Sequence, residues 1–203
     1  MRNERKTDWF LIRAEIATAA ARMIAEEGVT YETAKKKAAR QIMGNGRLNG
    51  KFLPDNQQIE DELRIYQALF MADTQPERLL HLRRLALEMM QELAEFQPYV
   101  TGAVLNGTAF EMSDIHLQLF ADSAKDVEIF LLNKNIDISV SEAKSNRSGV
   151  QAVENIHFYH KGEIFHLNVY SHDDMRKMPR TSDAVPQRAS IRELAEMIQS
   201  VDM

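Results

Sequence analysis

One short segment carries side chains that could bind a metal ion. Residues 114 to 119 read Asp-Ile-His-Leu-Gln-Leu, so polar and apolar residues alternate along the segment. An alternation of period two is typical of a β-strand, in which residues i and i+2 lie on the same face. Asp114 and His116 are therefore expected on one face. Carboxylates and imidazoles both bind metals, so the segment is a candidate metal site.

A turn and a short loop precede this strand. Gly107 and Thr108 interrupt a hydrophobic run, and five residues separate them from Asp114. A Gly-Thr turn, a loop and then Asp-apolar-x-apolar on a strand resemble the DNA polymerase β-like nucleotidyltransferase superfamily. The resemblance covers residues 99 to 170. It implies that Gly107 and Thr108 bind nucleotide phosphates through backbone N–H groups, and that three carboxylates hold two divalent cations.

In this chain, two of the three ligand positions that the resemblance implies hold histidine in place of a carboxylate. Asp114 matches the first carboxylate, whereas His116 stands at the second position. For the third position, the segment Glu-Ile-Phe-His-Leu-Asn-Val-Tyr-Ser places His166, while the competing Glu128 lies in a segment that we read as a helix. The implied catalytic and metal-binding set is thus Asp114, His116 and His166. Imidazole suits transition metals better than Mg²⁺, which prefers oxygen ligands.

For several other polar residues the sequence gives only weak indications of a role. His116 could equally be a polar residue on the solvated face of a half-buried strand. The arginines after the last strand could bind a nucleoside triphosphate; they are Arg176, Arg180 and Arg188. His157 and His160 are expected on opposite faces of their strand because they are three residues apart. His172, Asp173 and Asp174 are possible ligands, or residues of a turn at the strand end.

The whole chain limits the classes of function. Its 203 residues can bury a core, as one domain or two small ones. The absence of cysteine excludes disulfides, thiolate metal sites and cysteine nucleophiles. The sequence has no Rossmann, P-loop or nucleophile-elbow motif. It also has no apolar run long enough to span a membrane and no secretory signal, so we expect a cytoplasmic protein without a membrane partner.

The charge distribution leaves RNA as an alternative partner. A net charge of -5 argues against a general polyanion binder. Residues 1 to 51, however, carry 11 Lys plus Arg against 6 Asp plus Glu. The basic cluster formed by Lys35, Lys36, Lys37 and Arg40 is either a solvated helix face or a phosphate-facing surface.

The first half of the chain is predicted to be helical. Apolar residues recur at steps of three and four, which is typical of amphipathic helices. The predicted helices cover residues 8–27, 31–43, 56–70 and 75–96. Gly28 can end the first helix, Thr30 can cap the second, and Asp55 or Asn56 begins the third. These helices form a predicted module of residues 1–97.

Beyond Pro98 the period changes to two, which predicts a sheet. The predicted strands cover residues 99–105, 114–121, 136–142, 151–160 and 163–170, with a hairpin turn at Lys161-Gly162. Ser123 and Ser190 can cap two further helices, which end near residues 134 and 201. The expected fold class is α+β: an N-terminal helical module followed by a mixed β-sheet with helices at residues 98–203, nucleotidyltransferase-like.

Three functions follow from these expectations. The resemblance implies an enzyme that transfers a nucleoside monophosphate from a triphosphate to an acceptor. The histidines at two ligand positions favour weakened or lost catalysis, and hence a non-catalytic nucleotide-binding or regulatory protein. The third possibility is an RNA-associated protein that uses its basic N-terminal helices.

Overall fold

The computed structural model describes residues 4–44, 50–142, 154–177, 181–182, 185–186 and 188–201. It divides into two compact units, Met1–Pro76 and Glu77–Met203. Within the described ranges, no helix combines the length and the apolar character needed to cross a bilayer.

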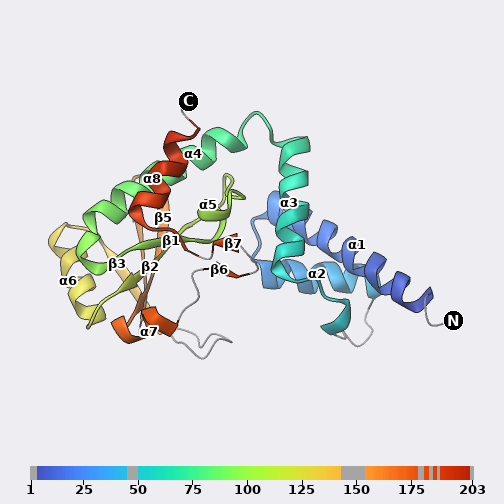
Figure 1. Cartoon of the computed structure of the whole chain (residues 1–203), viewed down its shortest axis with the longest axis horizontal. Helices are drawn as coiled ribbons and strands as arrows, with labels where there is room; N and C mark the ends of the chain where they lie inside the picture. Colours follow the sequence, from blue (N-terminus) through green and yellow to red (C-terminus); the bar gives the residue numbers. More distant parts are fainter. Residues whose placement is uncertain are drawn as a thin grey trace. The chain divides into compact units, whose positions relative to one another are not determined.

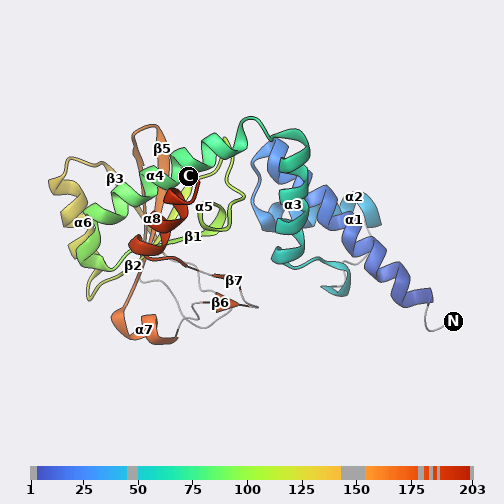
Figure 2. The same cartoon turned by 45° about the horizontal axis from the view of Figure 1, so that its top comes forward.

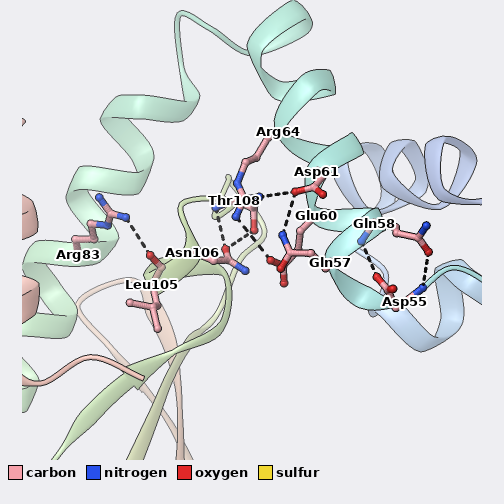
Figure 3. A network of polar contacts seen from close by, with 10 residues as sticks. All are labelled: Asp55, Gln57, Gln58, Glu60, Asp61, Arg64, Arg83, Leu105, Asn106 and Thr108. Carbon is pink, nitrogen blue, oxygen red and sulfur yellow. Dashed lines mark hydrogen bonds and ion pairs between the residues drawn. The ribbon is translucent and has the colours of Figure 1, made fainter. Parts of the chain in front are cut away.

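The first unit is built from α1 (Glu4–Glu27), α2 (Tyr31–Met43) and α3 (Asn56–Phe70), with a short 3-10 turn, η1, at Gly50–Phe52. Helix α1 contacts both α2 and α3. The predicted caps are confirmed: the N–H of Thr33 donates to the Thr30 hydroxyl, and Asp55 and Gln58 form a reciprocal capping box (Figure 3). The buried residues of α2 are all alanine, which allows this helix to approach its neighbours closely.

The second unit contains a mixed five-stranded sheet (Figure 1). Its strands are β1 (Tyr99–Thr101), β2 (Ile115–Phe120), β3 (Ile138–Glu142), β4 (Glu154–His160) and β5 (Glu163–Tyr170). They lie in the order β1-β2-β5-β4-β3. Strands β2 and β5 are parallel, and the other neighbours are antiparallel. The prediction that residues 114–120 and 163–170 are neighbouring strands is thus confirmed.

One face of the sheet is apolar and covered by helices. Strand β2 alternates Ile115, Leu117 and Leu119 on this face, and β5 alternates Phe165, Leu167 and Val169 opposite them. These side chains form one core with residues of α4 (Gln75–Glu92), α6 (Ala124–Asn133) and α8 (Ile191–Gln199). Figure 2 shows α4 and α8 over the sheet. Burial on this face provides the main hydrophobic stabilisation of the unit.

Helix α4 belongs with the sheet and not with the preceding helices. Its buried residues Leu82, Ala86, Met89 and Met90 lie in the core of the second unit. The expected boundary near residue 97 therefore lies after Pro76. The periodicity of α4 identifies its buried face, but it does not identify the element that covers that face. A 3-10 turn, η2 (Ala94–Phe96), follows α4 where we expected the helix itself to continue.

The predicted strand at residues 99–105 is wrong in its second half. The strand ends at Thr101, and the short helix α5 (Gly102–Asn106) follows it. Gly102 has a φ of 67°, a left-handed conformation that ends the extended backbone and that glycine adopts at low cost. The apolar pair Val104 and Leu105 is compatible with a strand or with a buried helix, so the local pattern was ambiguous.

The predicted caps of two later helices and the predicted hairpin turn are confirmed. The hydroxyl of Ser123 accepts the N–H of Lys125 at the start of α6, and Ser190 forms a capping box with Glu193 at the start of α8. Lys161 and Gly162 have φ values of 50° and 90° in the tight β4–β5 turn. The chain continues through α7 (His172–Lys177), β6 (Thr181–Ser182) and β7 (Val185–Pro186).

Candidate functional site

The second face of the sheet carries a row of polar residues. Pairing across neighbouring strands places five residues in line, in the order Thr101, His116, His166, His157 and Ser139. Because side chains alternate between faces, this row lies opposite the apolar core. His116, His166 and His157 are half-buried. Three neighbouring strands, β2, β5 and β4, thus each present one imidazole on the same face.

Asp114, His116 and His166 converge into one group. Their ligand atoms all lie within 4.8 Å of one another, and Nε2 of His166 is 3.0 Å from Oδ2 of Asp114. The rings of His116 and His166 are stacked, with centroids 4.8 Å apart and an interplanar angle of 11°. The parallel register that sets His116 beside His166 produces this arrangement.

Glu128, the competing candidate, lies elsewhere. It belongs to α6, whose buried residues pack in the core of the apolar face, and its carboxylate accepts from Nζ of Lys125 at 2.8 Å. The segment is therefore a helix, as predicted. Glu128 and the triad lie on different sides of the sheet.

The electrostatics of the triad favour a neutral imidazole at His116. Burial lowers the pKa of His116, and the neighbouring His166 lowers it further, while Asp114 opposes the shift. A neutral imidazole is the form that binds metal ions. The side chains of His166 and Asp114 are 26% and 38% exposed, so solvent and ions reach the triad.

The donor set fits one transition-metal ion. Zinc lies about 2.0–2.1 Å from nitrogen and oxygen ligands, so two ligand atoms of a tetrahedral site are about 3.4 Å apart. The 3.0 Å separation of His166 from Asp114 is close to this value, and all the ligand atoms of the triad lie within 4.8 Å of one another. Two Mg²⁺ ions do not fit, because only one of the three residues is a carboxylate.

Two residues that the sequence did not single out support His116. The hydroxyl of Thr101 donates to the backbone oxygen of His116 at 3.4 Å. A Cβ added at Gly102 would lie 3.9 Å from Cδ2 of His116, so the β1–α5 junction runs beside the imidazole. Nothing in the sequence indicated that Gly102 lies beside His116, because the end of the strand at Thr101 was not predicted.

Gly107 and Thr108 form a closed turn at the end of α5. The N–H groups of Gly107, Thr108 and Ala109 all approach the carbonyl of Ala103 within 3.1 Å. The N–H and hydroxyl of Thr108 also donate to Oδ1 of Asn106 (Figure 3). These N–H groups are thus engaged within the chain, and a phosphate at this turn would have to compete with existing hydrogen bonds.

Arg83 is a further residue that the sequence analysis missed. Its guanidinium donates to the carbonyls of Val104 and Leu105, two of the last carbonyls of α5. Figure 3 shows the contact with Leu105. A positive charge at a helix C-terminus is favourable, and the N–H groups of an arginine satisfy carbonyls that have no partner within the helix. Burial lowers the pKa of Arg83 from its usual value. Arg83 thus fixes the segment that leads into the turn.

The predicted phosphate-binding arginines are only partly described. Arg176 lies in α7, but its side chain is outside the described structure, and Arg180 lies outside the described residues. Arg188 is buried, with its guanidinium 4.9 Å from the ring centroid of Tyr99 and 5.3 Å from that of Phe120. Its Nη2 donates to the carbonyl of Met175. Arg188 therefore supports the sheet as a packed cation–π residue.

The basic cluster of α2 is largely engaged within its own unit. Nζ of Lys35 donates to Asn56, Nζ of Lys36 to Glu32, and Nζ of Lys37 to Glu27. The fourth member, Arg40, is exposed. These contacts favour a solvated helix face over a dedicated phosphate-binding surface.

Two other polar groups at the end of β5 have local partners. Nε2 of His172 lies 3.8 Å from Asp122, and Asp174 accepts from the Ser171 hydroxyl and donates its N–H to that oxygen. They form the turn that begins α7, as one of the two readings of this segment expected.

The candidate function therefore depends on the geometry of the polar face. The chain matches no protein family, no curated protein and no solved structure.

Proposed function

We propose that this protein is a nucleotidyltransferase-like protein that binds a single transition-metal ion and does not catalyse Mg²⁺-dependent nucleotidyl transfer. The ion is bound by Asp114, His116 and His166. The sequence resemblance supplies the expected position of the site, and the donor atoms determine its chemistry. Two imidazoles and one carboxylate favour Zn²⁺, Ni²⁺ or Cu²⁺ over Mg²⁺.

One observation carries this proposal. His116 of β2, His166 of β5 and Asp114, which directly precedes β2, have their ligand atoms within 4.8 Å of one another on a half-buried surface. Residues 114 and 166 are far apart in sequence, so no local pattern explains their approach.

Loss of transfer activity follows from charge. Two-metal phosphoryl transfer requires ions that stabilise both the attacking and the leaving oxygen. Such a site collects several carboxylates to neutralise two doubly charged ions. Asp114 alone cannot provide that charge, and Glu128 lies on the other side of the sheet.

A direct test measures metal affinity and transfer in the same preparation. We expect the wild-type protein to bind Zn²⁺ or Ni²⁺ more tightly than Mg²⁺ in a competition titration with a chromophoric chelator. We expect His116→Ala and His166→Ala each to weaken Zn²⁺ binding by more than about tenfold, because even residues that only orient a ligand contribute about 10–100-fold. His160→Ala is the matched control, since it removes an imidazole from β4 on the other face.

The activity arm uses pyrophosphate release from each nucleoside triphosphate with Mg²⁺ or Mn²⁺. We expect none above background from the wild-type protein. The double substitution His116→Asp and His166→Asp should raise Mg²⁺ affinity, because each change adds an anionic oxygen ligand. Robust Mg²⁺-dependent release by the unmodified protein would contradict the proposal, and so would equal affinities for Zn²⁺ and Mg²⁺.

Nucleotide binding stays a separate prediction. Calorimetric titration of a nucleoside triphosphate into the wild-type protein and into Gly107→Val tests the turn at Gly107 and Thr108. A weak, phosphate-dependent heat in the wild-type protein alone would support binding at this turn. Equal heats, or none at millimolar ligand, would exclude it.

A further inference from the structure

His157 extends the imidazole row by one strand beyond the triad. It stands directly opposite His166 in the antiparallel β4–β5 pair. The two rings have centroids 6.0 Å apart and planes tilted by 30°. On the other side of His166, the His116 ring is 4.8 Å away. His166 thus lies between two imidazoles on neighbouring strands.

The His157 ring is placed to move toward the triad. His157 is half-buried, and its ring forms no hydrogen bond or ion pair with the described residues. Directly opposite residues of a β-ladder have Cβ atoms about 4.5–5.5 Å apart, so their side chains share one neighbourhood. Rotation about the side-chain torsions of His157 changes the direction of its nitrogens without any change in the backbone.

The triad by itself leaves the ion incompletely coordinated. Zinc in proteins is almost always four-coordinate and tetrahedral in structural sites, whereas catalytic sites hold three protein ligands and one water. Asp114, His116 and His166 provide three ligands. The fourth position is therefore the feature that separates a site that presents an activated water from one that does not.

We propose that His157 occupies this fourth position, so that one metal ion is bound by Asp114, His116, His166 and His157 across β2, β5 and β4. This inference rests on the proposed metal binding and specifies its purpose. A four-ligand site leaves no bound water to act as a nucleophile. The ion then connects three strands and stabilises the polar face, as a structural or metal-sensing element.

With His157 as the fourth ligand, metal binding should stabilise β4 as well as β2 and β5. The metal-free protein keeps the ladder, because β4 and β5 pair through their backbones and through the apolar face. Metal binding moves the His157 ring toward His166 and reduces the motion of the side chains on the polar face of β4. The gain in stability on metal binding should therefore depend on His157, although His157 does not belong to the triad of Asp114, His116 and His166.

Co²⁺ substitution tests this coordination directly. Co²⁺ absorbs strongly in the visible range when it is four-coordinate, and weakly when water raises the coordination number. We expect the intense spectrum from wild-type protein, and X-ray absorption of the Zn²⁺ form should report three imidazoles. His157→Ala should retain metal but bind it at least about tenfold more weakly, and its Co²⁺ spectrum should lose intensity.

Controls separate a ligand from a residue needed for folding. His160→Ala should leave affinity and spectrum unchanged. His157→Glu replaces the imidazole with a carboxylate of similar reach, so it should restore four-coordination with a shifted spectrum. Circular dichroism and the metal-free Tm should be alike in the wild type and the His157 variants, since His157 lies on the face opposite the apolar core.

The outcomes distinguish this inference from the proposal on which it depends. Tight metal binding by wild-type protein with an unchanged spectrum and affinity in His157→Ala would overturn the four-ligand site and leave the triad in place. Absence of metal binding by the wild-type protein would overturn both. A spectrum of higher coordination number in the wild-type protein would show that water, and not His157, completes the site.

Discussion

The two faces of the central sheet differ in composition although they share the same strands. At the centre of β2, β5 and β4 the residues of one face are buried and apolar, while those of the other are half-buried histidine, asparagine and glutamine. The apolar face packs against three helices, and the polar face carries the ligand triad. The comparison teaches that neighbouring positions on one strand have separate roles. One set forms the core, and the other presents the group of side chains for which we propose metal binding.

The largest expected effect is on the apolar face. Leu167 is fully buried between neighbours on β2 and β4, so Leu167→Ala leaves a cavity. We expect the free energy of unfolding to fall by about 3 kcal/mol, as measured by urea denaturation. Asn168→Ala, one residue later on the polar face, removes the acceptor of an Asn155 hydrogen bond and should cost only about 1 kcal/mol. Similar losses for the two variants would refute the division between the faces.

A second effect appears on the polar face only when metal is present. Zinc at about a hundredfold excess over its Kd should raise the free energy of unfolding by about 2.7 kcal/mol, because the unfolded chain does not hold the triad together. His166→Ala should lose this gain and keep nearly the same metal-free stability. Thermal unfolding with and without Zn²⁺ measures both quantities. A gain that persists in His166→Ala would place the zinc elsewhere.

A third effect tests the edge where the apolar face meets α4. Nη2 of Arg78 donates to Glu163 at 2.7 Å, and their side chains are 18% and 11% exposed. Glu163→Gln should lower the free energy of unfolding by about 2 kcal/mol, because it weakens a charge-assisted pair that is largely buried. Glu196→Gln is the control, since its pair with Arg192 is exposed to solvent and should contribute much less than the buried pair.

The same pair predicts a pH dependence. The hydrogen bond from Arg78, with its charge, lowers the pKa of Glu163. A carboxylate with a lowered pKa stabilises the folded state above its unfolded pKa of about 4.3 and loses this contribution as the pH falls through the folded value. The difference between wild type and Glu163→Gln should therefore be constant above about pH 5 and shrink below about pH 4. A difference that grows on acidification would contradict this assignment.

The smallest effect concerns the turn after α5. Gly107 has a φ of 87°, so Gly107→Ala should cost about 1 kcal/mol of stability through backbone strain. Gly50 has no left-handed φ and no heavy atom within 4 Å of an added Cβ, so Gly50→Ala is the matched control. Chemical denaturation of both variants measures the difference. Equal stabilities would show that the turn relaxes without strain.

The sequence was informative where a local pattern fixes the structure. Alternation in residues 114–119 and 163–170 identified both strands, and side-chain caps at Thr30, Asp55 and Ser123 marked helix starts. The triad could be proposed because two residues on one strand share a face and the resemblance supplied His166. Alternation also separated His157 from His160, and the predicted hairpin placed residues 163–170 beside His157, but neither showed which strand lies on the other side of His166.

The rest depended on contacts between distant segments. The partner of α4 could not be read from its own periodicity, because any apolar surface can cover an amphipathic helix. The end of β1 depends on the left-handed φ of Gly102, which an apolar run does not reveal. The place of His116 beside His166 required the strand order, because the β4–β5 hairpin by itself brings only His157 and His166 together.

The parallel pairing of β2 with β5 has a consequence for how the triad forms during folding. His157 and His166 are close in sequence and meet when the β4–β5 hairpin forms, which takes microseconds in isolated hairpins. His116 lies fifty residues before His166, so its pairing requires closure of a long loop. Non-local and parallel pairings form slowly. The two-imidazole half should therefore assemble first, and Asp114 and His116 should complete the group only when β2 joins the sheet.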